Sequence, residues 1–266
     1  MAQQPKKRLV DYFSVFHRTF KGKVTCFPSP KDQHEDAPFP GAHVVGMFCF
    51  PLLHPCTEKQ KVNFFTLTSA DYSHTYGVVL RFPKPSTAGG EEGGGGDRGT
   101  DGSELPPPPS KRFLIDTQDD TGEEDSVAEQ AICLLSHFPF FRLFEQLLEE
   151  IYTIFVGGNS DMTNVPPLER YLQYITSEVP VPGRGECLHL CLRESVTFKQ
   201  HRFPIKDLPE VDQASFHLLF KTLSHENIVQ IIEAILMEQR IVLMSEHMEI
   251  LAPIGEALLA LLFPLQ

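Results

Sequence analysis

The residue types best suited to bind a metal gather at residues 187–191, where Cys187, His189 and Cys191 alternate with leucines. Thiolate and imidazole groups are common zinc ligands, so the cluster invites a metal-site interpretation. The period-two pattern predicts a strand with these three side chains on one face. Residues four positions apart on a strand lie about 13 Å apart, whereas a zinc–sulfur bond is about 2.3 Å. One ion therefore cannot take both cysteines, and we predict a mixed, partly exposed sheet face.

The remaining motifs offer no catalytic machinery. Cys49 and Cys56 have no second C-x-x-C or H-x-x-x-H to complete a zinc site, so we interpret them as ordinary thiols. Neither G-x-S-x-G nor H-E-x-x-H occurs, and the glycine-rich stretch lacks G-x-x-x-x-G-K-[ST]. We therefore predict no catalytic residue, no cofactor and no metal ligand.

Two charged residues that could contact a partner, Glu238 and Arg240, flank Gln239 where a predicted helix gives way to a predicted strand. An arginine in that position could also cap the helix carbonyls and offset the helix dipole. Both interpretations stay open, and Glu238 and Arg240 are the candidates for partner binding.

Charge and cysteine content narrow the class of protein. The 266 residues carry a net charge of −12, but residues 84–125 hold 11 acidic and 4 basic residues, which leaves only −5 for the rest. A body without a basic stripe does not suit nucleic acid. The six cysteines fit the reduced thiols of a cytoplasmic protein. The longest apolar stretch, residues 250–265, contains Glu256 and two prolines and is too short for a transmembrane helix, which needs about 20 residues.

Short apolar runs bounded by proline and glycine alternate with amphipathic stretches, which predicts an α/β protein. We expect strands at residues 9–16, 44–50, 131–136, 187–192 and 240–244, and a hairpin from residues 63–69 and 76–82. We expect helices at residues 139–155, 166–175 and 248–262, and two more capped by Asp212 and Ser224. Residues 84–125, rich in glycine, proline and acidic residues, predict a disordered insertion.

Several segments, in one order along the chain, resemble the DENN domain family. The most specific are NIV at residues 227–229, EQRIVLMS at residues 238–245 and ALLALLFP at residues 257–264. Further matches lie at residues 8–13, 39–40, 48–51, 64–68, 76–77, 80–82, 132–141, 168–171 and 178–182. Each piece alone carries little information, but their shared order is hard to obtain by chance.

The resemblance implies a two-lobed α/β fold. Residues 1–183 would form a longin-like upstream DENN lobe that carries the insertion, and residues 184–266 would form the first part of the core DENN lobe. The family pattern continues past Gln266, so we expect an incomplete module.

Members of the family are guanine-nucleotide exchange factors for Rab-type small GTPases in membrane trafficking. The resemblance therefore implies a Rab-family GTPase as partner, cytoplasmic location and peripheral recruitment to vesicle or endosomal membranes. The alternative is a non-catalytic Rab-binding adaptor, or a shortened DENN protein that serves as an interaction module.

Overall fold

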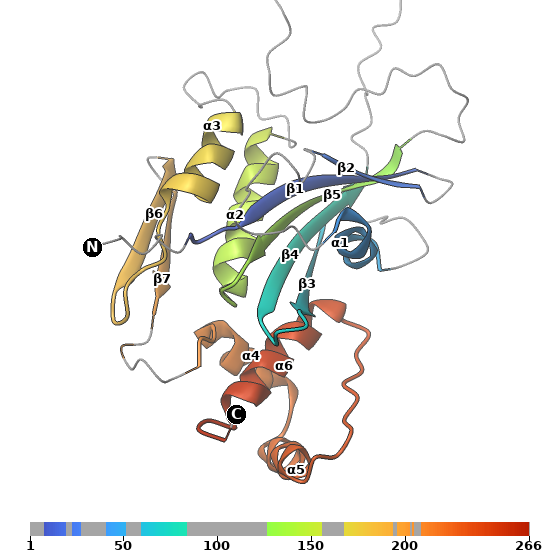
Figure 1. The fold of residues 1–266 in the computed structure, drawn as a ribbon, viewed down its shortest axis with the longest axis vertical. Helices are drawn as coiled ribbons and strands as arrows, with labels where there is room; N and C mark the ends of the chain where they lie inside the picture. The colour runs from blue at the N-terminus through green and yellow to red at the C-terminus, as the bar shows by residue number, and fades with distance from the viewer. Residues whose placement is uncertain are drawn as a thin grey trace, which may run out of the picture.

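A computed structural model describes residues 8–19, 23–27, 41–51, 60–83, 127–155, 168–193, 196–202, 204 and 209–265. The predicted insertion at residues 84–125 and Cys56 lie outside the described residues. Figure 1 shows a twisted sheet flanked by helices, with a second group of helices, α4 to α6, below one end of it. We call these two parts the sheet lobe and the helical lobe.

The sheet lobe is built on five antiparallel strands in the order β2-β1-β5-β4-β3. Their bounds are Tyr12–Thr19 (β1), Val24–Phe27 (β2), Lys61–Thr68 (β3), His74–Pro83 (β4) and Val127–Ser136 (β5). The central strand β5 pairs with β1 on one edge and β4 on the other, and residues 128–135 are buried throughout. The predicted hairpin is confirmed as β3 and β4, which pair from Lys61–Arg81 to Thr68–His74.

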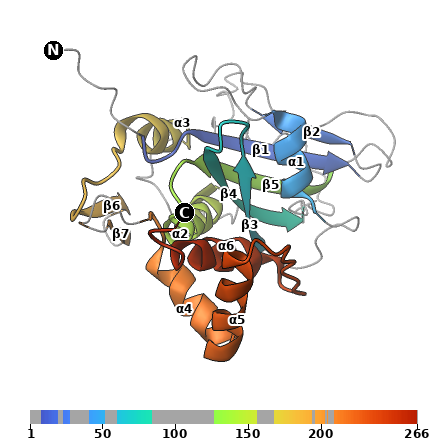
Figure 2. The same cartoon turned by 60° about the horizontal axis from the view of Figure 1, so that its bottom comes forward.

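Helices cover both faces of the sheet (Figure 2). Helix α1 (Ala42–Cys49) packs on one face over Phe16, Val79 and Cys133. Helix α2 (Phe141–Phe155) packs on the other face, and α3 (Leu168–Gln173) continues into the π-helical turn η4 (Tyr174–Glu178) on that same side. The order of strands and the placement of helices give the longin-like α/β lobe that the resemblance implies.

The helix predicted at residues 139–155 is confirmed as α2, and one side of it is apolar and buried. Phe144, Leu147, Leu148 and Ile151 are buried against the sheet, and Glu150 on the same helix is only partly buried. The helix begins two residues after Pro139, because a proline inside a helix costs about 3 kcal/mol.

Two predicted strands of the sheet lobe need correction. Residues 44–50 form α1 instead of a strand, with Val45 and Cys49, four residues apart, facing the sheet. A short, continuously apolar run has no periodicity that separates strand from helix, so only packing decides. The first strand occupies Tyr12–Thr19 and not residues 9–16, because Leu9 and Val10 precede the pairing with β5 and are buried in the core on the α2 side.

A two-stranded ribbon, β6 (Cys187–Arg193) and β7 (Val196–His201), joins the two lobes in the sequence. Leu190 is buried in the core of the sheet lobe and the half-buried Leu188 and Leu192 pack against that core, while His189 and Cys191 are exposed.

The helical lobe consists of α4 (Gln213–Thr222), α5 (His225–Leu236), the 3-10 turn η5 (Met248–Ile250) and α6 (Leu251–Ala260). Both predicted caps are confirmed: Asp212 accepts from the Ala214 backbone N–H, and Ser224 accepts from that of Asn227. The apolar side chains of Leu219, Ile228 and Ile254 are part of a separate small core.

The predicted strand at residues 240–244 is wrong. This segment has no regular secondary structure and pairs with no described strand, and Val242 and Met244 are 79% and 88% exposed. A β-strand forms only when a neighbouring strand exchanges backbone hydrogen bonds with it. The residues IVLM have side chains that favour a strand, but this preference does not supply a neighbouring strand.

Asp212 also joins the two lobes. One of its carboxylate oxygens caps α4, while the other accepts at 2.9 Å from the Arg142 backbone N–H in the first turn of α2. Burial raises the pKa of Asp212, and the two backbone donors act in the opposite sense because they favour the ionised form. A single carboxylate thus fixes the start of two helices and their mutual position.

Candidate functional site

A cavity of about 820 Å³ lies where the β3–β4 hairpin meets the helical lobe. This volume lies within the range of about 300–1,000 Å³ that is usual for ligand pockets. The hairpin contributes His74 and Tyr76, the turn between β5 and α2 contributes His137, and the helical lobe contributes Glu256 and Leu262. The cavity therefore opens at the junction of the two lobes.

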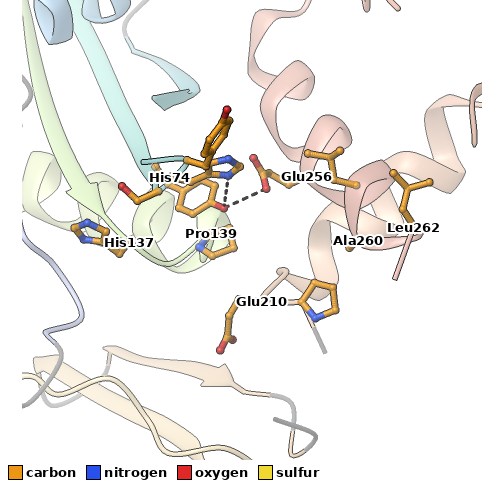
Figure 3. Close-up of a pocket in the computed structure, with 12 residues that line it drawn as sticks. His74, His137, Pro139, Glu210, Glu256, Ala260 and Leu262 are labelled. Atoms are coloured by element: carbon orange, nitrogen blue, oxygen red, sulfur yellow. Dashed lines mark hydrogen bonds between the residues drawn. The ribbon is translucent and has the colours of Figure 1, made fainter. Parts of the chain in front are cut away.

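Glu256 on α6 is the central polar group of this cavity. Figure 3 shows its side chain reaching from α6 toward His74 on β4. Its carboxylate accepts from the Tyr76 hydroxyl and from the Thr66 hydroxyl, each at 3.2 Å. The Tyr76 hydroxyl also lies 3.4 Å from Nδ1 of His74, which places three titratable groups in one short chain.

Burial shifts the pKa values of Glu256 and Tyr76 in this hydrogen-bonded group. Removal of water raises the pKa of Glu256, while the His74 charge and the two hydroxyl donors lower it. Burial also raises the pKa of Tyr76, and the neighbouring Glu256 carboxylate adds to that rise because it repels a phenolate. Tyr76 therefore stays a neutral hydrogen-bond donor at physiological pH.

The other charged groups of the cavity wall already have partners. His137 contacts the Asp11 carboxylate at 2.6 Å. Glu210 accepts from Arg202 at 2.5 and 2.8 Å and lies 2.9 Å from Arg184. Its carboxylate points away from Glu256 in Figure 3. These contacts commit the His137 and Glu210 side chains to partners within the protein, whereas the Glu256 carboxylate contacts only hydroxyl groups.

The arrangement is suited to bind a ligand. The hydroxyls of Ser73, Thr66 and Tyr76 are each held in hydrogen bonds within the protein, and the contact from Ser73 to Asp71 at 2.7 Å closes the hairpin turn. A carboxylate, two imidazoles and apolar walls are suited to hold a ligand in a defined orientation.

Comparison with protein families decides the class of the chain. The sequence profile of the uDENN domain matches residues 23–82, and that of the DENN (AEX-3) domain matches residues 127–266. The second match alone covers 140 of the 266 residues. The chain belongs to the DENN family.

Among curated proteins, two DENN proteins illustrate the similarity. The DENN domain and WD repeat-containing protein SCD1 of Arabidopsis thaliana is 29% identical over 140 residues, 53% of this chain and 12% of that protein. The DENN domain-containing protein C297.05 of Schizosaccharomyces pombe is 31% identical over 110 residues, 40% of this chain and 11% of that protein. The aligned part of this DENN chain thus corresponds to about a tenth of each relative's length.

No helix within the described ranges of the DENN chain is long and apolar enough to cross a membrane.

Glu238 and Arg240, the residues predicted to contact a partner, lie outside the cavity. Both are exposed and follow α5. The helix end is closed by the backbone, since the N–H groups of Glu238 and Gln239 donate to the carbonyls of Ile235 and Ala234. Glu238 takes the left-handed conformation of this motif with φ 54°, which usually favours glycine. Capping of the helix therefore does not require the Arg240 side chain, and partner contact by this pair stays a prediction.

The predicted sheet face at residues 187–191 is confirmed. Cys187 pairs across the ribbon with His201, with 3.5 Å between Sγ and Nε2, whereas Cys191 lies 3.4 Å from the Thr197 hydroxyl. The two cysteines therefore contact different residues, as their spacing predicts. Within the described part of the chain, no group of three His, Cys, Asp or Glu residues is arranged to hold a metal ion.

A second charged cluster is buried inside the sheet lobe, between the sheet and α1. Glu129 on β5 lies 2.5 Å from Arg18 on β1 and 2.6 Å from Arg81 on β4, and the Arg18 guanidinium stacks over Phe50. We call this the arginine–glutamate cluster. Because its three side chains are at most 8% exposed, it links three strands and offers no surface to a partner.

Sequence reasoning missed the cavity residues Glu256, Tyr76 and His74. One signal was available: Glu256 is the single charged residue in the apolar stretch 250–265. A lone carboxylate on an otherwise apolar helix usually has a specific partner. That partner lies 180 residues away on β4, so the sequence could not name it.

Proposed function

We propose that this chain belongs to a guanine-nucleotide exchange factor for a Rab-type small GTPase that acts in membrane trafficking. The supporting observation is that uDENN and DENN segments occur in order on one chain that folds as a longin-like lobe followed by a second lobe. The cavity at the lobe junction adds support, because the resemblance implies that the GTPase is gripped between the lobes.

Exchange of this kind needs no covalent step. The factor binds the nucleotide-free GTPase more tightly than the nucleotide-bound form, and this difference in binding free energy accelerates GDP release. A thousandfold acceleration requires about 4 kcal/mol of differential binding, since each factor of ten corresponds to about 1.4 kcal/mol.

Release of a fluorescent GDP analogue from a panel of Rab proteins tests the proposal. We expect one or a few members to release GDP faster when this chain, or a version extended through the rest of the DENN region, is added. A Ras-type GTPase serves as the control and should not respond. Unchanged GDP release from every Rab with the extended version would refute the exchange function.

The exposed apolar surface of the helical lobe favours a second candidate, a non-catalytic Rab-binding adaptor. Val229, Leu236 and Met237 on α5 and its C-terminal end are more than half exposed, as are Val242 and Met244 beyond it. Surfaces of this kind commonly mark protein contacts. Capture experiments with nucleotide-free, GDP-loaded and GTP-loaded Rab proteins separate the two functions. Preference for the nucleotide-free form supports exchange, and preference for the GTP form supports an adaptor.

Glu238 and Arg240 are proposed as contacts on this same part of the helical lobe. The changes Glu238→Ala and Arg240→Ala should reduce Rab capture severalfold without changing the far-ultraviolet circular dichroism spectrum. Equal capture by both variants would assign this pair to the helix end alone.

Two further parts of the proposal concern organisation and location. We propose that the boundary between the upstream and core DENN lobes lies at residues 183 and 184, although the leucines of β6 pack on the sheet lobe. A protein that ends at residue 183 should then run as a folded monomer in size-exclusion chromatography, and aggregation of this shorter protein would move the boundary past β6. The protein is proposed to be cytoplasmic and to reach vesicle or endosomal membranes through its GTPase. Fractionation of cells that contain or lack that GTPase should then show less membrane-bound protein when the GTPase is absent.

A further inference from the structure

The Glu256 carboxylate has no lysine or arginine partner among the described residues, and the basic group that acts on it is the imidazole of His74. The two contacts of the carboxylate are the neutral hydroxyls of Thr66 and Tyr76, both at the long distance of 3.2 Å. Among the described residues that line the cavity, none is lysine or arginine. A half-buried carboxylate is costly unless it is neutralised or paired, so this group favours a positively charged ligand.

The nearest carboxylate in the cavity wall does not share this role. Glu210 is held by two arginines, Arg202 and Arg184, and so its charge is satisfied. The other titratable groups that line the described cavity are the imidazoles of His74 and His137 and the phenols of Tyr72 and Tyr76. His74 is linked to Tyr76, and His137 is held by Asp11. Glu256 is therefore the group with unused acceptor capacity.

The remaining walls suit an aliphatic stem. Leu259 and Leu262 of the helical lobe and Pro139 of the β5–α2 turn line the apolar side of the cavity, while Tyr72 and Tyr76 present aromatic rings. Apolar side chains cover methylene groups, and aromatic faces attract cations that lie within about 6 Å of the ring centre.

Other ligand classes fit less well. A divalent metal ion needs several oxygen or nitrogen ligands, but only Glu256 offers an uncommitted carboxylate here. An anion would meet two carboxylates, and a neutral apolar ligand would remove water from Glu256 without replacing its hydrogen bonds.

We infer that this cavity is a binding site for an organic cation, an ammonium or guanidinium group on an aliphatic stem, with Glu256 as its counter-ion. The cation donates to the Glu256 carboxylate, and its stem lies along Leu259 and Leu262. Two sources supply this chemistry: a lysine or arginine side chain of a protein partner, or a free amine.

Titration of the protein with n-butylguanidinium chloride, followed by NMR or calorimetry, tests the chemistry of the site. N-butylurea is the control ligand because it has nearly the same shape and no charge. We expect saturable binding of butylguanidinium that is at least tenfold tighter than that of butylurea. Equal affinity for the two probes, or no saturable binding of the cation, would overturn the inference.

Matched variants assign the effect to one carboxylate. Glu256→Gln keeps the shape and should lose the preference for the cation, whereas Glu256→Asp keeps the charge and should retain part of it. Glu233→Gln, on the exposed side of α5, is the control and should bind as the unaltered protein does. Retention of full cation preference by Glu256→Gln would refute the role of this residue even if the Asp variant failed to fold.

A second arm identifies the source of the cation and rests on the proposed function. If a Rab protein responds in the exchange assay, a tenfold loss of its binding to Glu256→Gln, and competition by butylguanidinium, assign the cation to a side chain of the GTPase. Unchanged Rab binding together with Glu256-dependent probe binding assigns it to a free amine. If no Rab responds, the proposed function fails while the probe titration still decides the site.

Discussion

Replacement of Gly77 by alanine should destabilise the protein, because the ring of Phe65 occupies the space that a methyl group would need. The two residues face each other across β3 and β4. A Cβ atom on Gly77 would lie 2.1 Å from Cζ of Phe65 and 2.4 and 2.5 Å from its two Cε atoms. The ring is 5% exposed and stacks on Phe48 with 4.9 Å between ring centroids.

The loss of stability in Gly77→Ala can be estimated from the burial that the Phe65 ring loses. The Phe65 ring can leave its site, and loss of the burial of a phenylalanine costs about 1.5–3 kcal/mol. It can instead stay in a crowded site, where an inserted methyl group costs about 1–3 kcal/mol, so only one of these two costs applies. Removal of a glycine from a strand returns about 0.5–1 kcal/mol, since alanine has less freedom in the unfolded chain. We therefore expect the free energy of unfolding to fall by about 1–2 kcal/mol.

Gly255 provides a matched control with the opposite sign. It lies within α6, and a Cβ atom there would meet nothing within 4 Å. Gly255→Ala should therefore raise the free energy of unfolding by about 0.5–1 kcal/mol, the usual gain in a helix interior. Urea unfolding followed by circular dichroism measures both variants, and with a slope of about 3 kcal/mol/M the Gly77→Ala midpoint should fall by about 0.3–0.7 M.

A double-mutant cycle isolates the clash. In a Phe65→Leu background the ring is gone, so the further change of Gly77 to alanine should cost little or nothing. A Gly77→Ala protein as stable as the original would refute the packing argument. A penalty that persists in the Phe65→Leu background would locate the cause in the backbone of β4 instead.

The remaining predictions concern glutamates in different environments. Glu129→Gln should destabilise the protein by about 3–5 kcal/mol, because it leaves the two buried arginines of the arginine–glutamate cluster without a charged partner. The control Glu178→Gln, at an exposed ion pair, should cost at most about 1 kcal/mol. Equal melting temperatures of the two variants would contradict this prediction. Because burial raises the folded-state pKa of Glu256, the native state holds more protons than the unfolded chain between the unfolded and folded pKa values, and stability falls as pH rises through that window. Glu256→Gln should therefore gain stability relative to the unaltered protein as pH rises from about 4.5, and a pH-independent difference in urea midpoints would rule this out. Glu238→Gly should stabilise the protein by about 1 kcal/mol, because glycine adopts the left-handed backbone conformation at this position (φ 54°) without steric strain. An unchanged or lower urea midpoint would show that the Glu238 side chain makes a compensating contact.

Local features of this protein are determined by short stretches of sequence. The apolar stripe of α2, the β3–β4 hairpin and the caps at Asp212 and Ser224 each depend on residues within a few positions of one another. Their physical causes, side-chain periodicity and hydrogen bonding to nearby backbone N–H groups, act along the chain and can be predicted from it. The short segments that resemble the DENN family can likewise be recognised from neighbouring residues in the sequence.

Tertiary structure decided the features that depend on distant neighbours. Residues 44–50 became a helix because Val45 and Cys49 could pack on the sheet, and residues 240–244 formed no strand because no described strand pairs with them. The cavity depends on contacts between Glu256 and residues 180 and 190 positions away. The local sequence of α6 or of the hairpin does not predict these contacts, because a glutamate on a helix stands in the same sequence pattern whether its carboxylate faces water or a tyrosine. Only the docking of α6 against the hairpin removes water from Glu256 and makes its charge available for recognition.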